Sequence, residues 1–426
     1  MAAFHPRMKH PPEPGDHPLV SRRSWLVAGV VAAVGGCQSL PVRPPKNLPP
    51  PKPPGTVIAH SPAPSGRYIG SPSLAVLPDG SYVASHDFFG PASGEHQQAT
   101  SRVYRSRDRG RSWSLACEIH GAFWSSLFVH RDALYLIGPD RHHGRVLIRR
   151  SRDGGRSWTR PIDAQSGVLR PGPEHHGAPV PVVEHRGRLW RAIEARHPPQ
   201  AWGIHYRAGV MSVPVDADLL DARQWTTSDF LPSNRSWNDG DMGAWLEGNV
   251  VVAPDGSLAN LMRVDTQGLP EKAAWLRVAP DGKTLAFDAA SGFIDFPGGA
   301  KKFTVRPDPQ GGGYWSVATV VPRGWHTAGK PARVRNTLAL IHSPDLRHWD
   351  VRCHLLHHVD YHNHGFQYVD WLFDGPDLIA ACRTAFDDAH GGAHNAHDAN
   401  FLTFHRIPDF RALRLEDSML MTRFEP

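Results

Sequence analysis

Imidazole rings, guanidinium groups and a few carboxylates recur in this chain where short apolar runs begin or end. His86 and Asp87 directly follow the run 82–85, and Arg383 ends the apolar run 378–382. A histidine can exchange a proton near pH 7, and a neighbouring carboxylate can orient its ring. An arginine can hold a carboxylate through two parallel hydrogen bonds. The predicted catalytic residues are His86, His176 and Arg383.

A second set of candidates would surround a substrate. These residues combine cations, imidazoles and a few acids, and such a pocket suits an anionic sugar. The predicted substrate-binding residues are Asp87, Glu247, Arg263, Lys302, Arg306, Tyr361, His364, Gln367 and His397.

Several of these candidates have an equally simple structural explanation. His86 could be a core histidine with satisfied hydrogen bonds, and His175 and His176 could be ordinary loop residues. Lys302 could be a solvated strand end. Arg383 must reach either a pocket or an ion pair, because burying an unpaired guanidinium group is costly.

Metal binding is left open by the sequence. The segment 393–400 is rich in histidine, asparagine and aspartate, and it could form either a metal site or a hydrogen-bond network. Cys117, Cys353 and Cys382 have no spacing typical of a zinc or redox site. We expect no required cofactor, and the sequence also leaves open a structural Ca²⁺ in a central channel.

Two stretches of the chain share the pattern Ser-x-Asp-x-Gly-x-Ser-Trp, at residues 106–113 and again 45 positions later at 151–158. A shorter relative at 343–349 lacks the glycine. Ser and Asp side chains bond nearby backbone N–H groups, Gly adopts a positive φ, and Trp packs over the turn, so the pattern predicts a hairpin turn.

The repeats resemble the Asp boxes (BNR repeats) of the sialidase superfamily, whose members are β-propellers. Short β-rich runs also recur in groups of four, beginning with residues 71–77, 81–86, 102–106 and 113–119 and again near residues 123, 177, 248, 302 and 365. The sequence therefore predicts an all-β, six-bladed β-propeller of four-stranded antiparallel blades, with seven blades as the alternative. Residues 57–59 would supply the strand that closes the last blade.

Loop lengths predict where the site lies. The links between first and second strands are tight, whereas most links between second and third strands are long and polar, for example 87–101, 322–335 and 385–400. In an up-and-down blade these long links share one face, so the candidate residues should converge there.

Further stretches resemble a sialidase-like branch of propeller enzymes that remove terminal rhamnose linked to glucuronic acid by hydrolysis or β-elimination. These stretches are 69–74, 83–87, 366–371 and 394–406. The resemblance implies a catalytic histidine at the end of an early strand, which His86 matches. Hydrolysis similar to that of a true sialidase would instead use three arginines and a Tyr-Glu pair, for which Tyr361 and Glu247 are the candidates, but the Arg-Ile-Pro typical of sialidases is replaced at Arg67.

The N-terminus resembles a bacterial lipoprotein export signal. Arg22 and Arg23 precede a 12-residue apolar run, too short for a membrane span, that ends at Cys37. We expect a signal at 1–37 with lipidation of Cys37, a Pro-rich linker at 38–56 and a propeller at 57–426. A plain basic region with an incidental thiol is the alternative. The expected location is the bacterial envelope, periplasmic or attached to the outer membrane, with membrane contact through the lipid only.

The 47 Lys and Arg against 41 Asp and Glu give a charge of +6, too balanced for a nucleic-acid partner. The partner we expect is an oligosaccharide or polysaccharide. The sequence thus predicts a carbohydrate-active enzyme, a glycosidase or polysaccharide lyase, that cleaves a terminal uronate-containing glycan by elimination or hydrolysis. An exo-sialidase and a non-catalytic glycan-binding propeller are the alternatives.

Overall fold

The computed structural model describes residues 52–196, 203, 205–322 and 330–419. The predicted signal, Cys37 and most of the predicted linker lie outside the described residues. All described strands belong to one unit, residues 49–426. In the part of the chain that the structure describes, no helix is both long enough and apolar enough to cross a membrane.

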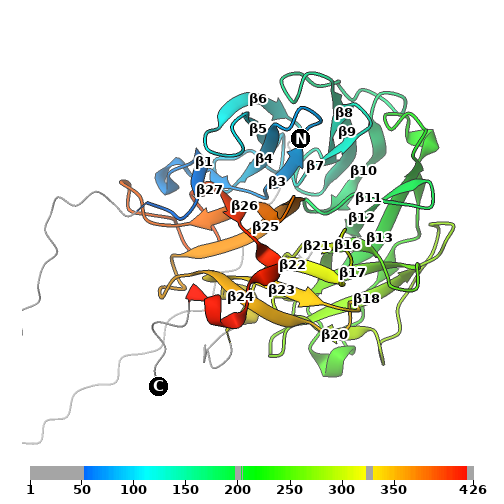
Figure 1. The fold of residues 1–426 in the computed structure, drawn as a ribbon. Helices are drawn as coiled ribbons and strands as arrows, with labels where there is room; N and C mark the ends of the chain where they lie inside the picture. Colours follow the sequence, from blue (N-terminus) through cyan, green and yellow to red (C-terminus); the bar gives the residue numbers. More distant parts are fainter. Residues whose placement is uncertain (1–51, 197–202, 204, 323–329, 420–426) are drawn as a thin grey trace, which may run out of the picture. The chain divides into compact units, whose positions relative to one another are not determined.

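The described residues form antiparallel sheets, and four of these are separate blades of four or five strands (Figure 1). β-Branched and aromatic residues recur in the strands, and glycine-containing turns separate many of them. The strands of these four sheets are β2 (Tyr68–Ile69), β3 (Ser73–Val76), β4 (Tyr82–Phe89), β5 (Thr100–Ser106) and β6 (Ser114–His120); β16 (Trp245–Val252), β17 (Leu258–Val264), β18 (Lys272–Val278), β19 (Leu285–Ala286) and β20 (Phe293–Asp295); β21 (Val305–Pro307), β22 (Tyr314–Thr319), β23 (Thr337–Ser343) and β24 (Asp350–His357); and β25 (Gly365–Asp374), β26 (Asp377–Ala385), β27 (Phe401–Ile407) and β1 (Thr56–His60).

The prediction of six or seven separate four-stranded blades is wrong, because the remaining strands form one continuous nine-stranded sheet. Its strands are β7 (Ser126–His130), β8 (Ala133–Pro139), β9 (Gly144–Ser151), β10 (Val168–His176), β11 (Val183–His185), β12 (Arg188–Arg196), β13 (Tyr206–Pro214), β14 (Thr226–Thr227) and β15 (Leu231–Pro232).

Strand β10 causes this fusion. It pairs with β9 at Val168, Arg170 and His175, and His175 and His176 at its end also pair with Ala195 and Glu194 of β12. Prolines 171 and 173 cannot donate to the ladder, and the register with β9 shifts across them. The sequence analysis placed both histidines before a new group at residue 177 and therefore missed the bridge.

The sheets follow one another in a closed ring. β3 contacts β7 and β25, β12 contacts β16, β16 contacts β21, and β22 contacts β25. Figure 1 shows these strands around the middle of the ribbon, and β1 pairs with β27 in the last sheet, as predicted for residues 57–59. Buried apolar side chains fill the space between neighbouring sheets.

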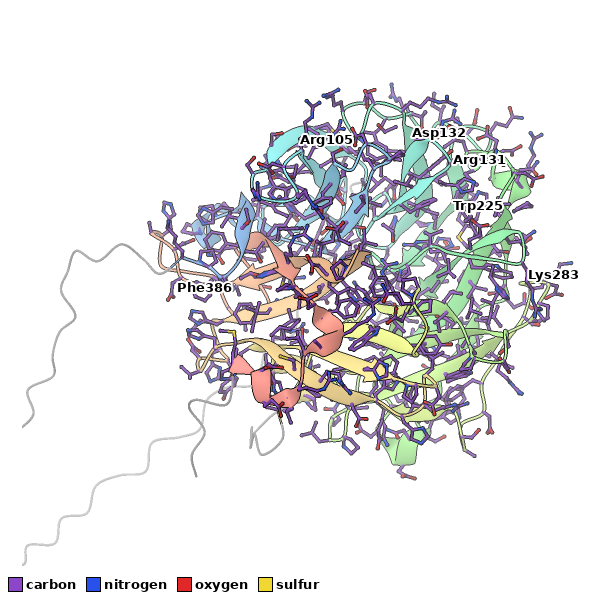
Figure 2. All side chains as sticks on the ribbon, viewed as in Figure 1. Arg105, Arg131, Asp132, Trp225, Lys283 and Phe386 are labelled. Atoms are coloured by element: carbon purple, nitrogen blue, oxygen red, sulfur yellow. The ribbon has the colours of Figure 1, made fainter. Side chains whose placement is uncertain are left out.

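The links between first and second strands are short. Arg131 and Asp132 alone join β7 to β8, and Figure 2 labels both residues in the upper right part of the view. One-turn 3₁₀ helices occur in the connections at η1 (Ala63–Ser65), η2 (Ala222–Gln224), η3 (Asn238–Gly240), η4 (Pro331–Arg333), η5 (Phe410–Ala412) and η6 (Leu415–Asp417).

Side chains at the starts of the innermost strands hydrogen-bond to the next strand. Ser73 Oγ in β3 donates to Asp370 Oδ2 in β25 at 3.0 Å and accepts from the N–H of Leu127 in β7 at 2.8 Å. Asn249 Oδ1 in β16 accepts from the N–H of Val305 in β21 at 3.1 Å. These buried bonds fix how far each innermost strand is shifted along its neighbours. The innermost strands carry several of the candidate residues.

The two complete Asp boxes form the hairpin-like turns that the sequence predicts. In the first, Ser112 N donates to Asp108 Oδ1 at 2.9 Å, Gly110 N donates to Ser106 Oγ at 2.8 Å, and the Trp113 indole donates to the Gly110 oxygen at 3.2 Å. The box at 151–158 repeats these bonds. These residues stabilise turns, and none of them belongs to the candidate site.

Replacing Gly110 by alanine should destabilise the fold more than replacing Gly80. Both glycines have positive φ, 87° and 78°, but a Cβ at Gly110 would lie 2.1 Å from the buried Phe404 ring, whereas a Cβ at Gly80 meets nothing within 4 Å. The clash adds about 1–3 kcal/mol to the backbone penalty that both variants share. Urea unfolding of Gly110→Ala and Gly80→Ala measures the difference, and equal losses would contradict the packing.

Candidate active site

Two innermost strands begin with the same irregularity. The pairing of β16 with β17 shifts register after Leu246, and the pairing of β25 with β26 shifts after Gln367. Glu247 and Tyr368 occupy the two bulges, each with a φ of 55°. Left-handed conformations are uncommon for such side chains, and they concentrate at functional sites.

The second strand of each sheet places an arginine beside its bulge. Arg263 pairs with Leu246, and Arg383 occupies the corresponding position opposite Gln367. Arg263 Nη1 donates to Glu247 Oε2 at 2.8 Å, and only 3% and 4% of these side chains are exposed. The bulge thus aims the carboxylate at the guanidinium group next to it.

Two more guanidinium groups lie against the ring of Tyr368. Arg383 Cζ is 4.7 Å from the ring centroid, and Arg335 Cζ is 5.7 Å from it. Arg335 Nη1 donates to Gln367 Oε1 at 2.6 Å, and Arg383 Nη2 donates to the His397 oxygen at 2.5 Å. We call Arg263, Arg335 and Arg383 the arginine cluster.

The arginine cluster carries more positive charge than its surroundings neutralise. Burial lowers the pKa of Arg335 to about 10, and repulsion from Arg263 and Arg383 adds to this effect. Burial also lowers the pKa of Arg383. Burial opposes the charge of Arg263 as well, but Glu247 and Tyr368 stabilise that charge and raise its pKa.

Among the described residues, neither Arg335 nor Arg383 makes an ion pair with a carboxylate; their hydrogen bonds go to an amide and a main-chain oxygen. Within the described residues, Glu247 is the one carboxylate that makes an ion pair with the arginine cluster, and it pairs with Arg263. Buried charges are costly unless they are paired. The cluster is chemically suited to hold an anionic group with bidentate geometry, such as a carboxylate.

An aromatic and imidazole wall stands beside the arginine cluster. The His176 ring stacks on Tyr206 at 4.5 Å and lies 4.4 Å from Trp124, and His176 Nδ1 is 3.1 Å from Glu194 Oε2. His143 Nε2 is 2.8 Å from the Tyr206 hydroxyl. Flat rings with hydrogen-bonding edges are the surfaces on which sugars commonly pack.

Glu194 and Tyr206 connect this wall to the bulge of β16. Glu194 Oε1 accepts from the N–H of Gly248 at 3.1 Å. Burial and the negative charges of Glu194 and Glu247 raise the pKa of Tyr206. Its phenol therefore stays protonated at neutral pH and can donate a hydrogen bond.

His86 lies apart from the arginine cluster. Its ring packs 4.8 Å from Phe88 and 5.7 Å from Tyr104, and its Nδ1 is 2.8 Å from the main-chain oxygen of Asp87. Burial lowers the pKa of His86 to about 4. None of its described contacts is with the arginine cluster, and its catalytic role stays a prediction that this placement does not test.

Asp87 joins two innermost strands. It accepts hydrogen bonds from the N–H groups of Ser71 at 2.7 Å and Trp124 at 2.5 Å, one on each carboxylate oxygen. Burial raises its pKa to about 7. Backbone N–H groups occupy both carboxylate oxygens. In this geometry Asp87 therefore holds in place the segments that lead into β3 and β7.

Lys302 and Arg306 tie β21 to β25. Lys302 Nζ donates to Thr304 Oγ1 at 2.7 Å and to the Val369 oxygen at 2.8 Å, and burial lowers its pKa to about 8. Arg306 Nη2 donates to Asp370 Oδ1 at 3.1 Å. These bonds continue the ring of contacts between innermost strands.

Tyr361 and His364 lie in the segment just before β25. The Tyr361 ring lies 3.9 Å from the His362 ring. The buried His364 lies 3.4 Å from Asp360 Oδ2 and 3.5 Å from Asp387 Oδ1. The tyrosine that shares Arg263 with Glu247 is Tyr368, seven residues beyond the predicted Tyr361.

Gln367 and His397 lie beside the arginine cluster. Gln367 Nε2 donates to the His397 oxygen at 2.9 Å, and burial lowers the pKa of His397 to about 3. His397 Nδ1 is 2.7 Å from Asp398 Oδ1, and His394 Nδ1 is 2.9 Å from Asp398 Oδ2. Both histidines thus share the carboxylate of Asp398. These contacts form a hydrogen-bond network within residues 393–400, which is one of the two arrangements that the sequence leaves open for this segment.

The sequence analysis missed Tyr368, Arg335 and Glu95. Tyr368 stands in the same relation to Arg383 as Glu247 does to Arg263, a correspondence that required aligning the two blades strand by strand. Arg335 and Glu95 lie in long second-to-third links that were predicted to face the site, but no spacing singled them out.

Three solved structures with glycosidase names have similar folds. The Hadza microbial sialidase Hz136 has a TM-score of 0.53 and 15% identity, over 81% of this chain and 66% of that one. The α-L-arabinanase of Penicillium chrysogenum, solved with arabinobiose, has a TM-score of 0.51 and 12% identity, over 84% and 98% of the chains. An α-L-arabinofuranosidase of Fusarium graminearum, solved with an iminosugar inhibitor, has a TM-score of 0.55 and 12% identity, over 84% and 98%.

At these identities the likeness shows the fold alone, a β-propeller. It bears on neither the rhamnosidase nor the lyase branch. No protein-family model matches the chain, and no curated protein matches it in sequence.

Acid should destabilise the protein through His86. The unfolded chain binds a proton on this histidine near pH 6.5, whereas the folded chain binds it only near pH 4. The contribution of His86 to the free energy of unfolding is therefore fully present above pH 6.5. It is lost as the pH drops towards 4, and the loss is up to about 3 kcal/mol.

His86→Gln lacks this proton and should lose less stability over the same range. Denaturant unfolding of both proteins at pH 7 and pH 4.5 measures the difference. If the wild type and the variant differ in free energy of unfolding by the same amount at both pH values, the result would contradict the burial of a neutral His86.

Proposed function

We propose that this protein is a glycoside hydrolase that releases a terminal acidic sugar, whose carboxylate is held by Arg263, Arg335 and Arg383. The observation that carries the proposal is the pair of buried guanidinium groups, Arg335 and Arg383, without an ion-paired carboxylate among the described residues. A sugar carboxylate would supply the missing negative charge. Arginine is the residue best suited to this geometry, because its fork matches the two oxygens.

The bond-breaking step is assigned to Tyr368 and Glu247. Both side chains act on the charge of Arg263, so the phenol and the carboxylate share one guanidinium neighbour. Glu247 accepts the phenol proton while the phenol oxygen attacks the anomeric carbon, and the aglycone oxygen leaves with the electrons of the glycosidic bond. Water then displaces tyrosine from the sugar, the departing phenolate takes its proton back from Glu247, and the proton of the water passes through solvent to the aglycone oxygen, so that the free sugar is released with net retention.

Hydrolysis is better supported than elimination. β-Elimination needs a base whose pKa lies near the working pH. Burial lowers the pKa of His86 to about 4, of His143 to about 2 and of His397 to about 3, so these imidazoles are weak bases. Tyr206, with a raised pKa, stays protonated at neutral pH and can donate a hydrogen bond to the substrate, but it cannot act as the base that elimination needs.

The substrate class follows from the two halves of the site. The arginine cluster selects a carboxylate, as in a uronic or sialic acid, and the wall around Tyr206 and His176 offers rings and hydrogen-bond donors to the neighbouring sugar. The envelope location and lipid anchor are part of this proposal and rest on the sequence of residues 1–37 alone.

The full chain should hydrolyse aryl glycosides of acidic sugars and not those of neutral ones. A suitable panel contains the 4-methylumbelliferyl glycosides of sialic acid, glucuronic acid and L-arabinofuranose, because this leaving group departs without a protein acid. Tyr368→Phe should lose at least about 10²-fold in kcat. The matched control, Tyr135→Phe in β8, should keep the wild-type rate.

Other outcomes would exclude the proposal in distinct ways. Release from the arabinofuranoside alone would mean that the arginine cluster does not select an acid. Equal rates for Tyr368→Phe and Tyr135→Phe would remove the nucleophile assignment. Ultraviolet absorbance of an unsaturated uronate from a natural glycan would indicate elimination, and binding without turnover would indicate a glycan-binding propeller.

A further inference from the structure

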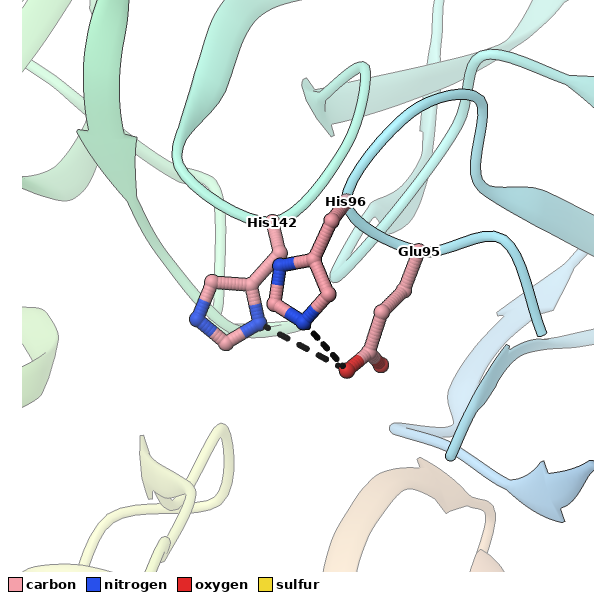
Figure 3. Close-up of side chains that lie close together, drawn as sticks. All are labelled: Glu95, His96 and His142. Atoms are coloured by element: carbon pink, nitrogen blue, oxygen red, sulfur yellow. Dashed lines mark ion pairs between the residues drawn. The ribbon is translucent and has the colours of Figure 1, made fainter. Parts of the chain in front are cut away.

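Glu95, His96 and His142 bring three potential metal ligands together beside the proposed site (Figure 3). Their ligand atoms all lie within 4.8 Å of one another. His96 Nε2 is 3.2 Å from Glu95 Oε1, and His142 Nδ1 is 4.0 Å from the same oxygen. We call these three residues the Glu-His-His cluster.

The cluster joins loops from two neighbouring sheets. Glu95 and His96 belong to the link between β4 and β5, and His142 belongs to the link between β8 and β9. The N–H of His142 donates to the main-chain oxygen of Glu95 at 2.8 Å, so the backbone already holds the loops together. The ligand atoms therefore approach one another on a fixed frame.

Two polar atoms of the cluster lack a hydrogen-bond partner. Glu95 Oε2 and His142 Nδ1 are both buried, and neither forms a hydrogen bond in the described structure. A buried polar atom without a partner costs about 1–3 kcal/mol. A cation bound by His142 Nδ1 and by both carboxylate oxygens of Glu95 would satisfy both atoms.

We propose that the Glu-His-His cluster binds a divalent transition-metal ion, with Zn²⁺ as the ion that its donors fit best. Two imidazoles and one carboxylate are a ligand set that Zn²⁺ accepts, and three protein ligands leave a fourth tetrahedral position for water or a substrate oxygen. Mg²⁺ and Ca²⁺ prefer sites made of oxygen atoms and fit the cluster poorly.

Charged groups of both signs lie near the cluster. Arg383 and Asp398 both act electrostatically on Glu95, with opposite signs. The ion would clamp the β4–β5 link to the β8–β9 link at the edge of the proposed site, and this binding does not depend on the proposed hydrolysis.

Isothermal titration of the full chain with Zn²⁺ tests the proposal. The chain contains 27 histidines and 4 cysteines, so the informative quantity is the difference between variants. His96→Ala and His142→Ala should each lose one equivalent of bound Zn²⁺ or weaken it at least about 100-fold. Mg²⁺ should not bind at this position.

The matched control is His120→Ala, which removes an exposed histidine from β6 of the same sheet. This variant should bind Zn²⁺ as the wild type does, and thermal unfolding without metal shows that each variant is folded. Zn²⁺ should also raise the Tm of the wild type more than that of His142→Ala. The same number of Zn²⁺ equivalents and the same affinities in all four proteins would overturn the proposal.

Discussion

Two buried guanidinium groups that have no ion-paired carboxylate among the described residues set the central constraint on this structure. Arg335 and Arg383 lie against the ring of Tyr368, and Arg263, the third cation, already uses Glu247. Removing charge from water costs several kcal/mol per ion, and repulsion among the three groups adds to that cost. A folded protein retains such an arrangement only if packing elsewhere supports it, and a bound anion would offset most of the cost.

The scaffold supplies that support through its innermost strands. Ser73, Asn249 and Asp370 hydrogen-bond to neighbouring strands, and β1 closes the ring by pairing with β27. On this frame the bulges hold Glu247 and Tyr368 in left-handed conformations. The fold tolerates this strained backbone because the strands on either side are held in place. The two bulges orient an acid and a phenol towards the same guanidinium group.

The sequence predicted the features that depend on local patterns. The Asp-box turns, the strands of the first sheet and the closing strand follow from turn chemistry and alternation, and the rule that strand starts and ends converge placed Glu247 near Arg263. It failed where the backbone departs from regularity. The end of β10 pairs with β12 and so joins strands that the sequence assigned to separate blades. The bulge at Tyr368 presents a residue that regular alternation would not select. Arg335 reaches the site from a long loop, whose path no local pattern encodes.

Saturation-transfer NMR of the full chain with pairs of sugar acids and their carboxamides tests the central claim most directly. Each pair has the same shape and differs by one negative charge, so it isolates the role of Arg335 and Arg383. The account predicts transfer to glucuronic or sialic acid, none to the carboxamides, and loss of the acid signal in Arg335→Met and Arg383→Met. Equal transfer to acid and carboxamide, or an acid signal that survives in both variants, would contradict it.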